Sequence, residues 1–209
     1  MRTHVICLGL ILFAVSASIC AAGDVEAPVY TEGRTKITAR LGERKVLLDD
    51  GQHGLKYSPD GAMTVLRTQP AYRILMAAGV SSWLLEGSGM DSLVPVKKVL
   101  EPGGKGSFDN GYAGISGAYR DETSGELLAF YHAEDHEGMG RLPNGVQGFY
   151  CSIGLAVSKD DGLSFTKMGP VITSARAKDP EGTRDQGCGE VCVLSDKSGQ
   201  YLYAYYTDH

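Results

Sequence analysis

A polar cluster at residues 131–136, with the sequence YHAEDH, holds side chains suited to chemistry. It contains His132, Glu134, Asp135 and His136, and imidazole and carboxylate groups can bind hydroxyl groups or a metal ion. His132 and Glu134 are two residues apart, so they share one face where the chain is extended. We expect the cluster to be a loop that follows a core strand. A solvated loop with one satisfied histidine is the alternative.

Three further acidic residues, Asp60, Asp109 and Glu190, stand close to segments with the composition of β-strands. Asp60 lies in the sequence SPDG, which is also an ordinary turn sequence. For Asp109 and Glu190, a role in a turn or an exposed strand stays open beside a role in catalysis.

Three cysteines follow the N-terminal segment: Cys151, Cys188 and Cys192. Three is an odd number, so at most one disulfide can form among them. The spacing of Cys188 and Cys192 does not predict a zinc site without a second pair of ligands. We expect these two cysteines to behave as small buried hydrophobic residues.

The elements that position these residues repeat along the chain. Residues 109–136 have the pattern of a strand, a tight turn and a second strand, and the pattern returns at residues 187–209. The turn Ser124-Gly125 matches Ser198-Gly199, and Asp121 aligns with Asp196. Supersecondary units that repeat at a long period, each with four antiparallel strands, predict a β-propeller.

The predicted fold is therefore all-β, a β-propeller of which this chain holds about two and a half blades. The units are residues 51–104, residues 105–174 and the start of a third at residues 187–209. The strands expected in them are Met63–Arg67, Tyr72–Ala78, Ser82–Glu86, Val94–Leu100, Leu127–Tyr131, Cys151–Val157, Met168–Thr173 and Tyr201–Tyr205. A propeller closes with about four to eight blades, so we expect an N-terminal part of a longer protein. A small β-sandwich is the alternative.

The segment Ser158–Phe165, with the sequence SKDDGLSF, places Asp and Gly at the tip of a hairpin. It resembles the Asp-box of sialidase-type propellers, in which the Asp side chain stabilises an outer turn. The resemblance implies a structural role for Asp160 and Asp161.

From about Gly51 to His209 the chain resembles the five-bladed propeller glycoside hydrolases of family 43. The resemblance lies in GISGAYRD with LLAFY, in SIGLAVSKDDGLSF with GPVI, and in GCGEVCVL with YLYAYYTD. It implies a central cleft with three carboxylates: a general base, a residue that tunes the pKa, and a general acid. An inverting glycosidase needs an acid at the leaving oxygen and a base on the opposite face.

The resemblance assigns the catalytic positions to Glu190 as general acid, Asp109 as auxiliary carboxylate and Asp60 as base. In the family the general acid lies in a Glu-x-Pro sequence, whereas Glu190 here is followed by Val191-Cys192. The first unit also lacks the Arg-Asp-Pro sequence that marks the family's base. Substrate-binding positions are expected at His132, Asp135, Tyr112 and Arg184. We expect no metal in the catalytic site and no required cofactor, and a structural calcium ion stays open.

The first 22 residues have the three parts of a secretory signal peptide: a basic start, an apolar run of about a dozen residues and a small-residue exit. We expect cleavage near Ala22 and a secreted or periplasmic product. An N-terminal arm is expected at residues 23–50, with an outer strand at residues 45–48 as the alternative, and a loop is expected at residues 51–62. A lipoprotein anchored through Cys20 is the second alternative. The net charge of −5 and the lack of a basic stripe argue against nucleic acid as a partner. With the signal removed we expect no membrane contact and, at full length, a monomer.

Together with the signal peptide, the resemblance implies a secreted glycoside hydrolase that acts on polysaccharides or oligosaccharides. Two alternatives concern the same fold: a sialidase-like exo-glycosidase and a non-catalytic carbohydrate-binding propeller. A sialidase needs an arginine cluster for the substrate carboxylate. The candidates are Arg120, Arg141, Arg176 and Arg184. A structural surface protein is a further alternative.

Overall fold

The computed structural model describes residues 41–209, and Lys45–His209 form one compact unit. The expected signal peptide and residues 23–40 of the expected arm lie outside the described residues. The described part is all-β, since its only helices are α1 (Asp50–His53) and the 3-10 helix η1 (Met90–Ser92).

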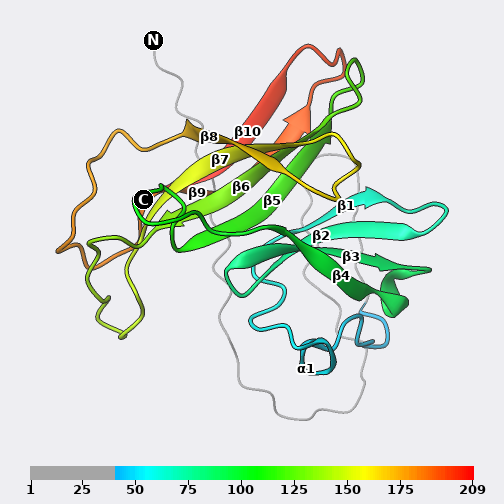
Figure 1. Cartoon of the computed structure of the whole chain (residues 1–209), viewed down its shortest axis with the longest axis horizontal. Helices are drawn as coiled ribbons and strands as arrows, with labels where there is room; N and C mark the ends of the chain where they lie inside the picture. Colours follow the sequence, from blue (N-terminus) through cyan, green and yellow to red (C-terminus); the bar gives the residue numbers. More distant parts are fainter. Residues whose placement is uncertain (1–40) are drawn as a thin grey trace, which may run out of the picture. The chain divides into compact units, whose positions relative to one another are not determined.

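The first sheet is an antiparallel meander of β1 (Met63–Arg67), β2 (Tyr72–Ala78), β3 (Ser81–Gly87) and β4 (Val94–Leu100), in that order (Figure 1). The two inner strands carry consecutive apolar residues, which are buried because both faces of the sheet are covered there. All four strands of this sheet lie within residues 51–104.

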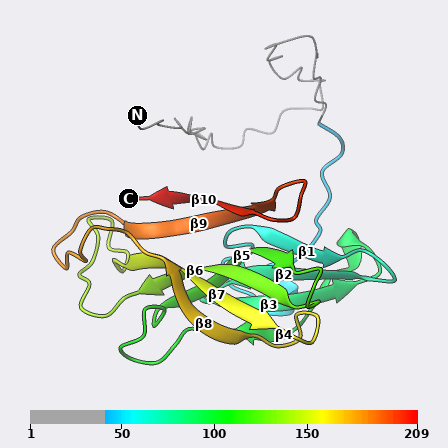
Figure 2. The same ribbon diagram turned by 90° about the horizontal axis from the view of Figure 1, so that it is seen from above.

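The second unit is formed by β5 (Tyr112–Arg120), β6 (Leu127–Asp135), β7 (Tyr150–Ser158) and β8 (Thr166–Ile172), again antiparallel. The hairpin of β9 (Gln186–Ser195) and β10 (Leu202–Asp208) begins the third, and β9 joins the start of β7 by a short parallel pairing. Figure 2 shows this hairpin beside the second unit. The fold is thus an all-β arrangement of propeller-like blades, as predicted, and the strands of residues 41–209 do not close into a ring.

The predicted repeat is visible in the turns that follow β5 and β9. The Asp121 N–H donates to the Glu126 carbonyl oxygen at 2.9 Å, and the Asp196 N–H donates to the Tyr201 carbonyl oxygen at 3.0 Å. In both turns the Asp carboxylate also accepts a hydrogen bond from the nearby serine hydroxyl, and the following glycine has a positive φ. Equivalent side chains therefore close equivalent turns.

The first two units are joined by a shared apolar core and by an ion-pair cluster. Leu75 and Leu84 of the first sheet are buried in one cluster with Ile115 and Tyr131 of the second. Separately, the Arg73 guanidinium donates to the Asp161 backbone oxygen at 2.9 Å and to its carboxylate at 2.8 Å. Asp161 thus links its own turn to the neighbouring unit.

Four local predictions are corrected by the structure. Residues 45–48 form no strand and are mostly exposed, so the arm was the better of the two interpretations. The loop expected from Gly51 begins inside α1. Strand β6 continues through the polar cluster to Asp135, because alternate residues such as Ala133 face the core. Cys192 is exposed, whereas Cys151 and Cys188 are buried, and all three are free thiols.

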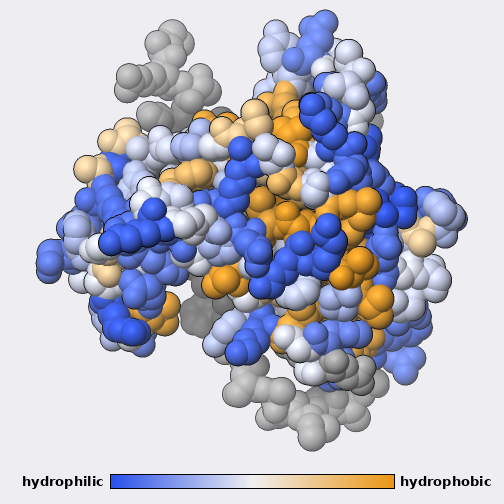
Figure 3. Space-filling view, viewed as in Figure 1, coloured by the Kyte–Doolittle hydropathy of each residue, from blue (hydrophilic) through white to orange (hydrophobic). Residues whose placement is uncertain are grey.

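The surface drawn in Figure 3 has its apolar side chains gathered over the strands, while the connecting loops are largely polar. The exposed apolar residues of the outer strands include Val94 and Val96 of β4 and Met168 and Val171 of β8. No helix within residues 41–209 has the length and apolar character needed to cross a membrane.

Candidate functional site

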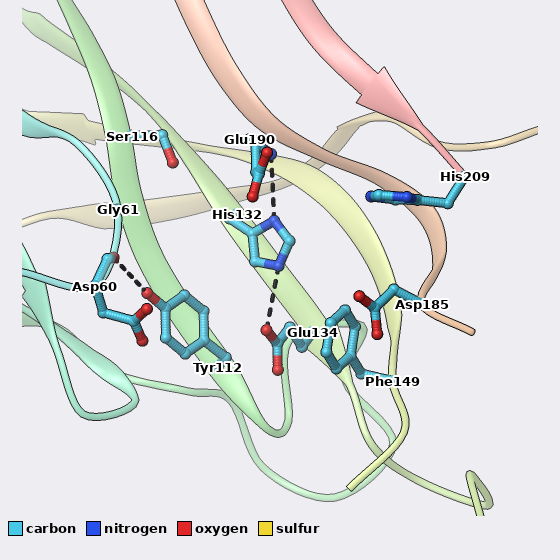
Figure 4. Close-up of a pocket in the computed structure, with 10 residues that line it drawn as sticks. All are labelled: Asp60, Gly61, Tyr112, Ser116, His132, Glu134, Phe149, Asp185, Glu190 and His209. Carbon is cyan, nitrogen blue, oxygen red and sulfur yellow. Dashed lines mark hydrogen bonds and ion pairs between the residues drawn. The ribbon is translucent and has the colours of Figure 1, made fainter. Parts of the chain in front are cut away.

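A pocket of about 200 Å³ lies where the three units meet. Its walls come from the loop before β1, from β5, β6 and β9, from the residues just before β7 and β9, and from the residue after β10. The lining residues, drawn in Figure 4, are Asp60, Gly61, Tyr112, Ser116, His132, Glu134, Phe149, Asp185, Glu190 and His209. Four of these ten carry carboxylates and two carry imidazoles, so the pocket is strongly acidic and can exchange protons.

His132 lies between two of the acidic residues, as Figure 4 shows. Its Nε2 is 3.2 Å from Glu134 Oε1, and its Nδ1 accepts a hydrogen bond of 3.3 Å from the Glu190 backbone N–H. His136 Nε2 contacts the other oxygen of Glu134 at 2.6 Å. The Glu134 carboxylate of β6 is therefore held between two imidazoles, and the His132 imidazole also contacts the backbone of β9.

Glu190 occupies an unusual backbone position. Its φ is 52°, in the left-handed region that side chains other than glycine rarely adopt. The pairing of β9 with β10 is irregular at this point: Cys192 pairs with Tyr205 and Gly189 with Thr207, so two residues of β9 face one of β10. Such a bulge re-aims a side chain, and bulges are frequent beside active sites. Here it leaves Glu190 exposed and on the pocket wall.

Glycines on both sides of Cys188 make this approach possible. A Cβ at Gly189 would collide with the His132 ring, and a Cβ at Gly187 would collide with the Cys151 backbone. Gly187 also has a φ of 90°. The sequence GCGE therefore lets β9 come close enough to β6 and β7 to place Glu190 beside His132.

Asp60 enters the pocket from the loop before β1. Its backbone N–H donates to Ala77 O at 2.9 Å, and its backbone oxygen accepts a 3.0 Å hydrogen bond from the Tyr112 hydroxyl. Partial burial raises the pKa of the Asp60 carboxyl, the Tyr112 hydroxyl lowers it, and the charge of Glu134 raises it again; the net shift is upward. Asp60 thus binds a proton more readily than an ordinary aspartate.

The pKa of Glu134 is shifted in the opposite direction. Burial raises it, but the hydrogen bonds and charges of His132 and His136 outweigh burial and hold it below the usual range. Two carboxylates of one pocket are thereby given different proton affinities, which is a common property of acid–base sites.

Aromatic rings form the remaining wall. The Tyr112 and His132 rings meet edge to face at 5.7 Å, and Phe149 lies 6.1 Å from both His132 and His136. Apolar ring faces next to a few convergent polar groups are typical of a small-molecule site.

A second, larger pocket of about 320 Å³ adjoins the first and shares Asp185 and His209 with it. Its wall includes Tyr150, Arg176 and Arg184, and the Tyr150 hydroxyl donates to the Arg176 carbonyl oxygen at 2.7 Å. The two pockets together offer room for a ligand with more than one ring.

Of the residues predicted for the site, the structure brings Asp60, Tyr112, His132 and Glu190 together in the first pocket. Glu190 lies within β9 rather than before it, because the strand begins at Gln186. Arg184 lines the adjoining pocket.

Asp109 does not line the pocket. Its carboxylate is buried, with 1% of the residue exposed, and it accepts hydrogen bonds from the Tyr131 hydroxyl at 3.1 Å and from Lys167. The predicted meeting of Asp109 and Glu190 is therefore not seen, because the side chain of Asp109 turns into the sheet toward β6 and β8.

Asp135 also faces away from the pocket. It alternates with Glu134 along β6, and its carboxylate pairs with Lys178 at 2.7 Å and accepts from Asn110. These contacts tie down the segment after β8, so the structure places Asp135 in a loop anchor rather than beside a ligand.

Glu134 is the pocket carboxylate to which the sequence assigned no definite role, although its two-residue spacing from His132 placed it on the same face. Phe149, Asp185 and Ser116 had no signal in the sequence. Within residues 41–209 no group of three or more His, Cys, Asp or Glu side chains is arranged to hold a metal ion. The structural calcium ion stays a prediction.

No protein-family model matches the chain, and the search of curated proteins found no match. Two solved structures are similar in their backbone. One, described as an exo-beta-1,3-galactanase from Bifidobacterium bifidum, has a TM-score of 0.47 and 12% identity over 72% of this chain and 46% of its own. The other, BT0996 in an RGII complex, has a TM-score of 0.49 and 18% identity over 70% of this chain and 47% of its own. The protein thus spans about half the length of either structure.

Proposed function

We propose that this protein hydrolyses glycosidic bonds in the pocket that contains Asp60, Glu134 and Glu190. The observation that carries the proposal is the convergence of these three carboxylates from different units, with shifted proton affinities at Asp60 and Glu134 and an aromatic wall. Glycoside hydrolysis requires a carboxylic acid and a carboxylate on opposite sides of the scissile bond. The resemblance to the family 43 propellers supports the same chemistry.

In the proposed mechanism Asp60 is the general base. It takes a proton from water while the water oxygen attacks the anomeric carbon, and Glu190 gives its proton to the departing glycosidic oxygen. A raised pKa makes the Asp60 carboxylate a stronger base once it is ionised. Glu134 stays ionised between its two histidines and supports the raised pKa of Asp60, in the role first predicted for Asp109.

The substrate class in this proposal is an oligosaccharide or polysaccharide. Tyr112 and Phe149 supply ring faces, and Ser116 supplies a hydroxyl at the pocket wall. The adjoining pocket, with Arg184 and Tyr150, would take the next sugar unit. Export through the proposed signal peptide would bring the protein to the compartment where such polymers are met.

The sialidase-like alternative needs arginines in the site. Among the described residues that line the first pocket there is no arginine. Arg120 pairs with Asp161, and the Arg141 guanidinium donates to Gly145 O. The geometry therefore favours carboxylate chemistry over recognition of an anionic sugar in this pocket.

The test is hydrolysis of a panel of aryl glycosides and natural oligosaccharides by the full-length protein and its variants. Asp60→Asn and Glu190→Gln should each lower kcat by about 10²–10⁴-fold, the usual effect of removing a general acid or base. Glu122→Gln, which changes an exposed carboxylate in the β5–β6 turn, should leave kcat unchanged. Sugar binding at the pocket without turnover would instead establish the carbohydrate-binding alternative.

A further inference from the structure

We propose that His132 is a positioning residue that holds the Glu190 backbone through Nδ1, and that it does so only while its imidazole is neutral. The consequence for catalysis rests on the function proposed above, whereas the backbone contact does not. The inference begins from the direction of one hydrogen bond.

A backbone N–H can only donate, so the 3.3 Å contact from Glu190 N requires a lone pair on His132 Nδ1. The neutral imidazole then carries its proton on Nε2, which faces Glu134 Oε1 at 3.2 Å. The hydrogen-bond partners of the ring thus assign its tautomer. A single ring joins the carboxylate of Glu134 to the main chain of Glu190.

The Glu190 amide needs this partner. At a β-bulge the extra residue is left out of the strand ladder, and a backbone N–H without an acceptor is unfavourable. A left-handed φ in a residue other than glycine persists only where its surroundings enforce it. The acceptor at His132 Nδ1 is such an enforcing contact, and Gly189 provides the space for it.

Protonation of the ring would break this hydrogen bond, since a proton on Nδ1 would occupy the lone pair and point at the Glu190 N–H. The ionisable groups around His132 come from every neighbouring element: Glu134 of β6, His136 just after β6, Asp60 of the loop before β1, Tyr112 of β5, Cys151 of β7, Glu190 of β9 and, farther along the pocket wall, Asp185 and His209. Lowering the pH should therefore release the Glu190 backbone and move its carboxylate out of position.

Two variants separate the two ends of the ring. In His132→Asn the side-chain oxygen can replace Nδ1 and accept from Glu190, while the contact with Glu134 is lost. In His132→Gln the side-chain nitrogen can replace Nε2 and donate to Glu134, while the acceptor for Glu190 is lost. Both substituted side chains are neutral at every pH, and urea unfolding of each variant verifies that it is folded.

The experiment follows the ¹⁵N–¹H signal of Glu190 and the ring signals of His132 in the full-length protein as the pH is lowered. We expect the Glu190 amide to titrate together with the His132 ring in the wild type and to lose that step in both variants. His132→Asn should keep the amide shift of the wild type at neutral pH, and His132→Gln should not. A Glu190 amide that ignores the His132 titration, or that is unchanged in His132→Gln, would overturn the proposal.

Measurements of kcat and KM give a second test of the positioning role of His132. His132→Gln should have a kcat about 100-fold below the wild type with little change in KM, the effect expected when a reacting group is displaced by about 1 Å. His132→Asn should lose much less of its kcat. Because this variant has no imidazole at position 132, its kcat should lack the fall at low pH that accompanies protonation of His132 in the wild type. Equal losses in both variants would refute the positioning role. If the protein hydrolyses no glycoside at all, the proposed function fails, and the amide titration still decides the role of His132.

Discussion

Replacing Glu190 with glycine is expected to stabilise the protein and abolish its activity. A left-handed backbone is unfavourable by roughly 1–2 kcal/mol for an L-residue, and glycine avoids this strain. Glycine also has more conformational freedom in the unfolded chain, which offsets about 0.5–1 kcal/mol of the stabilisation gained by removing the strain. Because the Glu190 residue is exposed, removing its side chain forfeits little buried surface. The net gain should be about 0.5–1 kcal/mol.

The matched control is Glu190→Ala, which removes the carboxylate and keeps the Cβ that causes the strain. The glycine variant should be more stable than the alanine variant by about 1 kcal/mol. In urea, with a slope of about 2 kcal/mol per molar, the midpoints would differ by about 0.5 M. Both variants should lose hydrolysis. Equal midpoints would show that the backbone at Glu190 is unstrained, and retained hydrolysis in either variant would remove its carboxylate from the chemistry.

The remaining predictions concern residues outside the pocket. Asp160→Ala should lower the free energy of unfolding by about 1 kcal/mol with kcat unchanged, because the Asp160 carboxylate accepts from the Ser158–Ser164 turn. Hydrogen bonds, of which the one from the Ser164 hydroxyl contributes most, lower the pKa of Asp160 to about 2. The difference in unfolding free energy between wild type and variant should therefore be fully present above about pH 4 and be lost as the pH falls through 2. Arg73→Met should lower the free energy of unfolding by about 2 kcal/mol, since it removes charged hydrogen bonds to Asp161, and an unchanged urea midpoint would refute the link between units. Lys167→Met should cost about 3 kcal/mol by leaving the Asp109 carboxylate buried and unpaired, and the folded fraction should keep its kcat.

Much of the fold could be predicted from the sequence because its strands are separated by strong local turn signals. The segments Met63–Arg67, Tyr72–Ala78 and Val94–Leu100 have in the structure the bounds that were expected. The Ser-Gly turns after β5 and β9 revealed the repeat, since the same Asp, Ser and Gly side chains and backbone conformations close both. These features depend on neighbours within a few residues.

The site was less predictable because its geometry depends on contacts between units. Asp109 and Glu190 occupy similar places in the sequence, yet one carboxylate is buried against Lys167 and the other lies on the pocket wall. What separates them is the bulge in β9, and a bulge depends on the register of two strands. Glu134 was placed on the face of His132 by the two-residue period, but its position between two imidazoles required the extension of β6 through the polar cluster.

The most direct test of the proposed chemistry is the dependence of the Glu190→Gln defect on the leaving group. A general acid is needed when the departing oxygen must be protonated, and it matters little when the leaving group is stable as an anion. We predict that Glu190→Gln lowers kcat for a natural oligosaccharide by about 10²–10⁴-fold and lowers it far less for an aryl glycoside with an activated leaving group. Small and equal losses on both substrates, in a variant that is folded by its urea midpoint, would contradict the assignment of Glu190 as the general acid.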